Sequence, residues 1–211
     1  MRCVIFCAGG FAGLAEPVRT DDYVIAADGG VAHVQALGLR ADAVLGDFDS
    51  LGYVPVGAQV FPIEKDDTDS MLAVRHGLRL GCNEFFLYGA LDGQRLDHTI
   101  ANLQTLRFLV ERGAVGHLIG VRQTVSVVRN GILRFASGCE GYLSLFCMGD
   151  RAVGVTIEGL HYTLTEGALS GGFPLGVSNA FIGESAAVRV ADGCLIAVYD
   201  RTNPLPEVKL C

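Results

Sequence analysis

The chain has 211 residues, half of them apolar, which is enough for one large domain or two small ones with a substantial core. Its formal net charge of −7 and lack of basic runs exclude a general nucleic-acid binder, and no apolar run approaches the roughly 18 residues of a membrane span. Seven widely spaced cysteines without a CxxC pair predict reduced thiols in a cytoplasmic protein.

Short apolar runs alternate with helical patterns through the first part of the chain. The predicted strands are residues 3–8, 23–27, 43–45, 58–61, 84–88 and 115–119. The predicted helices are residues 31–37, 70–80 and 97–112, each followed by a glycine. This alternation predicts an α/β domain over residues 1–122, with a mainly parallel sheet flanked by helices.

The pattern changes after about residue 122. Short strands are predicted at residues 124–135, 141–147, 152–157, 160–164 and 186–199, separated by glycine-containing turns. No convincing helical pattern interrupts them. Residues 123–211 are therefore predicted to form an all-β sandwich domain.

Unusual polar residues follow nearly every predicted strand of the first part. They are Gly9 and Gly10, then Asp28 to Gly30, then Asp47 and Asp49, then Asp66 to Asp69, and finally residues 89–97. Because parallel strands end at a common edge, we expect at least five acidic residues to converge on a single cleft. Glycines at the same edge let backbone N–H groups approach an anion closely.

The acidic residues form two clusters, GDFDS with Asp47 and Asp49, and KDDTD with Asp66 and Asp69. A lone DxD is often a turn, and one acidic residue at a helix start often complements the helix dipole, with Thr68 or Asp69 as the cap. Three acids in four residues exceed that role. Crowded carboxylates are usually relieved by a divalent cation, so we interpret this stretch as a Mg²⁺ and phosphate site.

A third motif, GALDGQRLDHTIANL, spans residues 89–103. Arg95 offers a planar fork for phosphate oxygens, and Asp97 lies at a helix start. The alternative is a surface ion pair between the two side chains. Asn102 faces either the cleft or solvent. The residues predicted to bind nucleotide are Gly10, Asp28, Gly29, Thr68, Arg95 and Asn102.

In this order, the Asp28-Gly29-Gly30 run, the three motifs and a VSN segment in an all-β tail resemble the thiamine pyrophosphokinase family over nearly the whole chain. The resemblance implies Mg²⁺-dependent transfer of the pyrophosphoryl group of ATP to the hydroxyethyl oxygen of thiamine, giving thiamine diphosphate and AMP. It also implies a homodimer whose thiamine sites lie where the subunits meet.

The resemblance also implies roles for single residues. Those implied to be catalytic are Asp47, Asp49, Asp66, Asp69, Arg95 and Asp97, of which the first four are also the implied Mg²⁺ ligands. Asp97 or Asp28 would accept the alcohol proton. Ser178 and Asn179 match the segment associated with thiamine, and Phe173 or Phe181 would stack on its rings, since the chain has no Trp. The third motif departs from the family in reading Gly93-Gln94-Arg95, and Ala180 stands where Glu is common.

Two other functions compete with this interpretation. A haloacid-dehalogenase-like phosphohydrolase also has an apolar strand followed by DxD, although here the motif follows the third strand and Gly46 intervenes. A nucleotide-binding module without turnover would need only part of the acidic set. Formation of AMP from ATP, with and without thiamine, separates the three.

Overall fold

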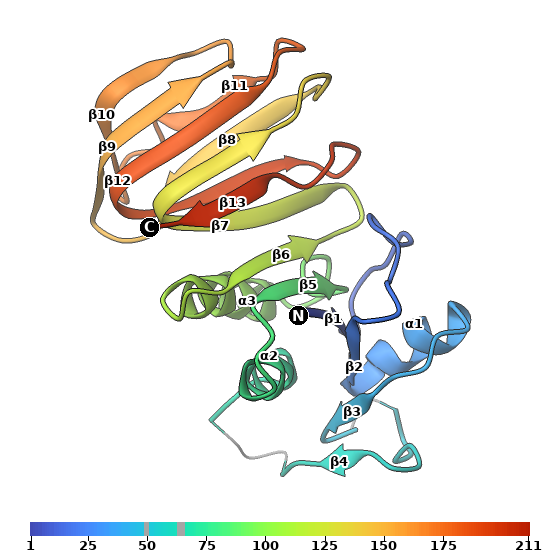
Figure 1. Ribbon diagram of the computed structural model, residues 1–211. Coiled ribbons are helices and arrows are strands. Elements are labelled where there is room, and N and C mark those ends of the chain that lie inside the picture. The colour runs from blue at the N-terminus through green and yellow to red at the C-terminus, as the bar shows by residue number, and fades with distance from the viewer. Residues whose placement is uncertain (49–50, 63–65) are drawn as a thin grey trace. The chain divides into compact units, whose positions relative to one another are not determined.

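The structure is a computed structural model that describes residues 1–48, 51–62 and 66–211 (Figure 1). The chain forms two compact units, one of Met1–Leu109 with Gly116–Val121 and one of Val110–Val115 with Arg122–Cys211. The first unit combines strands with helices, and the second consists mainly of strands. In the described part of the chain, no helix has the length and apolar character needed to cross a membrane.

The first unit contains the parallel sheet that the sequence predicts. Its strands are β1 (Arg2–Phe6), β2 (Tyr23–Ala27), β3 (Ala43–Gly46), β4 (Gln59–Val60), β5 (Glu84–Tyr88) and β6 (Val115–Ile119), in the spatial order β6-β5-β1-β2-β3-β4. Strand β1 pairs in parallel with both β2 and β5, so Phe6 lies beside Ala26 and Tyr88. Strands β1, β2 and β5 are almost entirely buried, as expected for a sheet covered on both faces.

The helices of this unit start and stop close to the predicted residues. They are the 3₁₀ helix η1 (Asp28–Gly30), α1 (Val31–Ala36), α2 (Asp69–Arg79) and α3 (Leu96–Val110). Gly38, Gly81 and Gly113 follow α1, α2 and α3 with φ of 64°, 85° and 72°, a left-handed conformation that ends helices. Gly77 lets α2 lie close to the sheet, because a Cβ there would be 2.7 Å from the Phe85 ring.

The second unit is all-β and antiparallel, as predicted. Its strands are β7 (Gln123–Phe135), β8 (Tyr142–Cys147), β9 (Arg151–Glu158), β10 (Leu164–Ser170), β11 (Gly176–Ala180), β12 (Ala186–Asp200) and β13 (Glu207–Leu210). One edge of β12 pairs with β7 along nearly its whole length, while the other edge pairs with β9 and then with β8. The two halves of this unit therefore share β12 and belong to one large mixed sheet, while the separate sandwich domain stays a prediction.

The segment between β9 and β11 also differs from the prediction. Residues 160–164 are not a strand, because Leu160 makes only an isolated bridge to Phe181 and β10 begins at Leu164. The intervening chain is held by a side chain instead. Asn179 accepts a hydrogen bond from the Tyr162 N–H (2.8 Å) and donates one to the Tyr162 carbonyl (2.6 Å).

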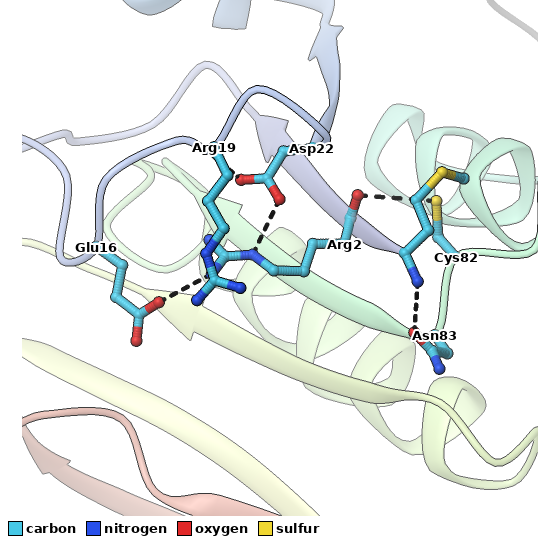
Figure 2. A network of polar contacts seen from close by, with 7 residues as sticks. Arg2, Glu16, Arg19, Asp22, Cys82 and Asn83 are labelled. Carbon is cyan, nitrogen blue, oxygen red and sulfur yellow. Dashed lines mark hydrogen bonds and ion pairs between the residues drawn. The ribbon is translucent and has the colours of Figure 1, made fainter.

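A buried polar network fixes the long connection between β1 and β2 in the first unit (Figure 2). The Arg2 guanidinium bonds to Asp22 and Glu16, each at 3.1 Å, and lies 4.3 Å from the centre of the Phe86 ring. Asp22 in turn accepts the Arg19 N–H at 2.8 Å. Removing Asp22 would take away the buried partner of the Arg2 charge, so this ion pair helps to hold the connection in place.

His117 on β6 gives the first unit a predictable response to pH. The side chain is 2 % exposed, and burial lowers its pKa to about 4. The unfolded chain, with a His pKa near 6.5, therefore binds the proton first as the pH falls, so stability is present above about pH 6.5 and declines toward pH 4. We expect a loss of about 1.4 kcal/mol between about pH 7.5 and 5.5, measured by urea unfolding. His117→Leu should lack this component, and equal losses in both proteins would contradict it.

Candidate active site

The predicted edge of the parallel sheet exists, and the ends of its strands are in close contact. The Cys7 N–H donates to the Tyr88 carbonyl (2.8 Å), and the Gly9 N–H donates to the Gly89 carbonyl (2.9 Å). Ala27 at the end of β2 lies beside Leu45 near the end of β3. The segments that leave β1, β2, β3 and β5 are thus neighbours. We call this edge the rim, defined by Cys7, Asp28, Asp47, Asp69 and Gly89.

Glycines let the chain at the end of β3 approach Asp28 closely. A Cβ on Gly46 would lie 3.1 Å from the Asp28 Cα, and a Cβ on Gly30 would lie 1.9 Å from the Phe6 carbonyl oxygen. These spacings let the chain after β2 cross directly over the ends of its neighbours. Asp28 and Phe48 both have positive φ, at 47° and 58°, although neither is glycine. Strain of this kind gathers at functional sites.

Asp28 and the second acidic cluster approach each other around Cys7. Burial raises the pKa of the Cys7 thiol to about 12, with further contributions from the charges of Asp69 and Asp28. Both carboxylates therefore act on the same sulfur, although 41 positions separate them in the sequence. The thiol remains neutral at physiological pH and adds no further negative charge to the rim.

The start of α2 divides its acidic residues between different roles. Thr68 is the N-cap and accepts the Met71 N–H at 3.2 Å, as the sequence suggested. Asp69 lies in the first turn, while Asp66 precedes the helix and is exposed. Asp67 makes an ion pair with Arg75 at 3.0 Å. The third acid of this cluster thus has a structural partner on its own helix.

The glycine loop after β1 packs against the loop after β5. The Gly10 N–H, a predicted nucleotide contact, donates to the Asp92 carbonyl at 3.2 Å, and His33 Nε2 lies 3.0 Å from the Gly9 carbonyl oxygen. Gly29, another predicted contact, lies within the 3₁₀ helix that follows β2. Asn102 is buried and bonds to Ser70 and Ala90, so it faces the protein interior instead of solvent.

Arg95 and Asp97 are placed as the surface pair that was the alternative prediction. Arg95 Nη2 lies 2.6 Å from Asp97 Oδ2, and the two side chains are 67 % and 64 % exposed. The hydrogen bond from Arg95 is the main cause of a lowered pKa for Asp97, and the same bond raises the pKa of Arg95. In this arrangement the guanidinium is occupied by a carboxylate of its own chain.

The described residues include only some of the carboxylates that the resemblance implies as Mg²⁺ ligands. Among residues 1–48, 51–62 and 66–211, no three or more His, Cys, Asp or Glu side chains form a group that could hold a metal ion. Asp49, one of the implied ligands, lies outside these ranges. Mg²⁺ usually takes only one or two protein carboxylates, with waters and substrate phosphates completing its shell. The hard oxygen donors of Asp47 and Asp69 suit that mode of binding.

The residues associated with thiamine lie on β11 of the second unit. Ser178 is exposed, has φ of 58° and donates its N–H to Ser144 Oγ at 3.0 Å. Asn179 is buried and holds Tyr162, as described above. Phe181 is 8 % exposed and packs edge-to-face on Phe135 with ring centres 5.2 Å apart. Phe181 is thus a core residue.

Two neighbouring cavities in this unit offer other aromatic surfaces. One, of about 310 Å³, is lined by Tyr162, Leu164, Leu175 and Val177 among others, and Tyr162 is 64 % exposed. Phe173, 65 % exposed, lines the other, of about 150 Å³. Sequence reasoning missed Tyr162, because nothing in its immediate neighbourhood marks it as an exposed aromatic held by a buried amide.

Comparisons with known proteins agree with this geometry. Residues 14–114 match the family model "Thiamin pyrophosphokinase, catalytic domain", and residues 130–195 match "Thiamin pyrophosphokinase, vitamin B1 binding domain". Among curated proteins, none matches the chain.

Solved structures show that the fold is shared. The thiamine pyrophosphokinase of Bacillus subtilis is 21 % identical with a TM-score of 0.85, over 95 % of this chain and 99 % of that one. The enzyme from Geobacillus thermodenitrificans is 24 % identical with a TM-score of 0.79, over 95 % and 97 %. The enzyme from Candida albicans is 13 % identical with a TM-score of 0.73, over 94 % and 88 %.

The two family models describe two parts of the same enzyme, occur in the order in which the two units follow each other, and together match most of the chain. This chain therefore belongs to the thiamin pyrophosphokinase family.

Proposed function

We propose that the rim of the first unit carries the reaction of the family, in which the pyrophosphoryl group of ATP is transferred to thiamine. The observation that supports this most directly is the convergence of Asp28 and Asp69 on Cys7, next to the strand end that bears Asp47. Carboxylates gathered at the carboxyl edge of a parallel sheet suit a nucleotide bound through a divalent cation.

The chemistry needs position and charge compensation more than covalent catalysis. The thiamine hydroxyl oxygen bonds to the β-phosphorus, the bond to the oxygen that bridges the α and β phosphorus breaks, and AMP leaves. Mg²⁺, when bound, would neutralise the charge on the triphosphate oxygens. Asp47 and Asp69, with Asp49 and Asp66 by resemblance, would hold it there. The convergence of Asp28 and Asp69 on Cys7 supplies the electrostatic reason for a cation.

Of the two candidate bases, Asp28 suits the role better than Asp97. Asp97 is exposed, and its hydrogen bond with Arg95 lowers its pKa, which makes it a weaker proton acceptor. Asp28 follows β2 at the rim and is partly buried. Arg95 would have to exchange Asp97 for phosphate oxygens in order to steady the transferring group.

The assignment of the two substrates follows the two units. We assign ATP to the first unit and thiamine to the second, and we propose a homodimer with thiamine between subunits. Exposed apolar side chains on the second unit, including Tyr142, Phe146, Phe173 and Leu175, support an interface there. A reducing compartment such as the cytoplasm suits seven cysteines that are all thiols.

The test is AMP formation from ATP and Mg²⁺, with and without thiamine. The proposal predicts AMP only when thiamine is present, with one thiamine diphosphate per AMP. Release of inorganic phosphate without thiamine would indicate a phosphohydrolase. Nucleotide binding without AMP under either condition would indicate a binding module.

A further inference from the structure

A chain of buried hydrogen bonds connects the start of α2 to the loop after β5. Thr68 Oγ1 lies 3.0 Å from Ser70 Oγ, which lies 2.6 Å from Asn102 Oδ1. Asn102 Nδ2 lies 2.6 Å from the Ala90 carbonyl oxygen. Ser70 and Asn102 are 8 % and 6 % exposed. Three segments of the first unit, the start of α2, helix α3 and the loop after β5, thus meet through polar atoms in a largely buried place.

The direction of every bond in this chain follows from elementary donor chemistry. Asn102 Oδ1 only accepts, so the Ser70 hydroxyl must donate to it. Ser70 Oγ then accepts from the Thr68 hydroxyl, and Thr68 Oγ1 accepts the Met71 N–H at 3.2 Å. The protons of both hydroxyls are committed within the protein. Thr68 and Asn102 are expected from the sequence to bind nucleotide, but the Thr68 hydroxyl proton and one Asn102 Nδ2 proton are used within the protein.

These hydrogen bonds connect segments that lie at or next to the rim. Thr68 lies between Asp67 and Asp69 at the point where the acidic segment enters α2. Ala90 adjoins Gly89, whose carbonyl accepts the Gly9 N–H from the loop after β1. The acidic segment is also held by the partly exposed Asp67–Arg75 ion pair, and pairs of that kind contribute little to stability. The buried bonds are the stronger restraint.

We propose that Ser70 and Asn102 are positioning residues that hold the carboxylates at the start of α2 against the ends of β1 and β5, and thereby set the affinity for the metal–nucleotide complex. This inference rests on the proposed function. Neither residue touches substrate. Each acts through Thr68 and the backbone that carries Asp66 and Asp69, because a carboxylate must be held to within a fraction of an ångström to coordinate well.

The test compares two hydroxyl deletions in the same unit. Ser70→Ala removes the central hydroxyl of the chain. Thr105→Val removes another buried hydroxyl, which is 1 % exposed. This hydroxyl donates to the Ala101 carbonyl of its own helix at 3.0 Å. Thermal unfolding gives the loss of stability in each variant. Calorimetry with Mn²⁺ and α,β-methylene ATP, whose α–β linkage cannot be cleaved, gives the affinity without turnover.

We expect Ser70→Ala to weaken binding of the metal–nucleotide complex about tenfold while the KM for thiamine stays within about twofold. Thr105→Val should destabilise the fold but leave that affinity unchanged. Ser70→Ala combined with Asn102→Ala should bind no more weakly than Asn102→Ala alone, because both deletions break one chain. Unchanged affinity in Ser70→Ala, or an equal loss in Thr105→Val, would overturn the proposal.

Binding alone decides the role of these residues. A wild-type protein that binds the complex and makes no AMP would contradict the proposed reaction without altering the comparison between the two variants. A wild-type protein that fails to bind the complex would overturn both proposals.

Discussion

Asp69→Asn is expected to lower the rate of AMP formation by about a thousandfold while the protein remains folded. Asn has the size of Asp but lacks the charge that a cation on the triphosphate requires. Asp69 and Asp28 both act on the Cys7 thiol, so removal of one carboxylate also relieves repulsion between like charges. We therefore expect the Tm to stay the same or to rise. Rate and Tm are measured on the same preparation.

Asp67→Asn is the matched control, because it removes the same charge two positions away. Asp67 is paired with Arg75, so its loss should change stability by less than about 1 kcal/mol and activity by less than about threefold. An Asp69→Asn variant within tenfold of wild-type activity would exclude a role in holding the metal. An equal loss in Asp67→Asn would mean that net charge, and not position, matters.

Local sequence features predicted the first unit well. Glycines with positive φ follow the ends of the helices, and apolar runs mark the buried strands. Both features could be predicted because each depends on residues that are close together in the sequence. For the second unit, the sequence predicted the all-β class but not which strands pair. The pairing of β12 with three other strands depends on contacts between distant segments, and no local pattern encodes it.

The site shows the same division between local and distant information. Asp28, Asp47 and Asp69 were predicted to lie at one edge because each follows a strand in the sequence. The end of a strand can be recognised locally, and in a parallel sheet such ends lie side by side. The partner of each side chain was not predictable in this way. Asn102 facing inward and Phe181 entering the core depend on which face of an element meets its neighbour.

Gly89→Ala is expected to destabilise the fold strongly through both its backbone conformation and its contacts at the rim. Gly89 has φ of 67°, and a Cβ there would lie 2.3 Å from the Cys7 carbonyl oxygen and 3.1 Å from that of Gly9. The left-handed conformation costs Ala about 1–2 kcal/mol, and overpacking against fixed backbone adds about 1–3 kcal/mol. Relief requires the ends of β1 and β5 to separate. Turnover should therefore fall as well, even in the fraction that folds.

Gly38→Ala separates these two contributions. Gly38 has a similar φ of 64°, but among the described residues no atom beyond its own chain neighbours lies within 4 Å of the position that its Cβ would occupy. Its replacement should cost only the conformational part, about 1–2 kcal/mol by urea unfolding, with turnover unchanged. Equal losses of stability in the two variants would show that the strands at the rim can part freely. The close approach of β1 and β5 would then not be what holds the carboxylates in register.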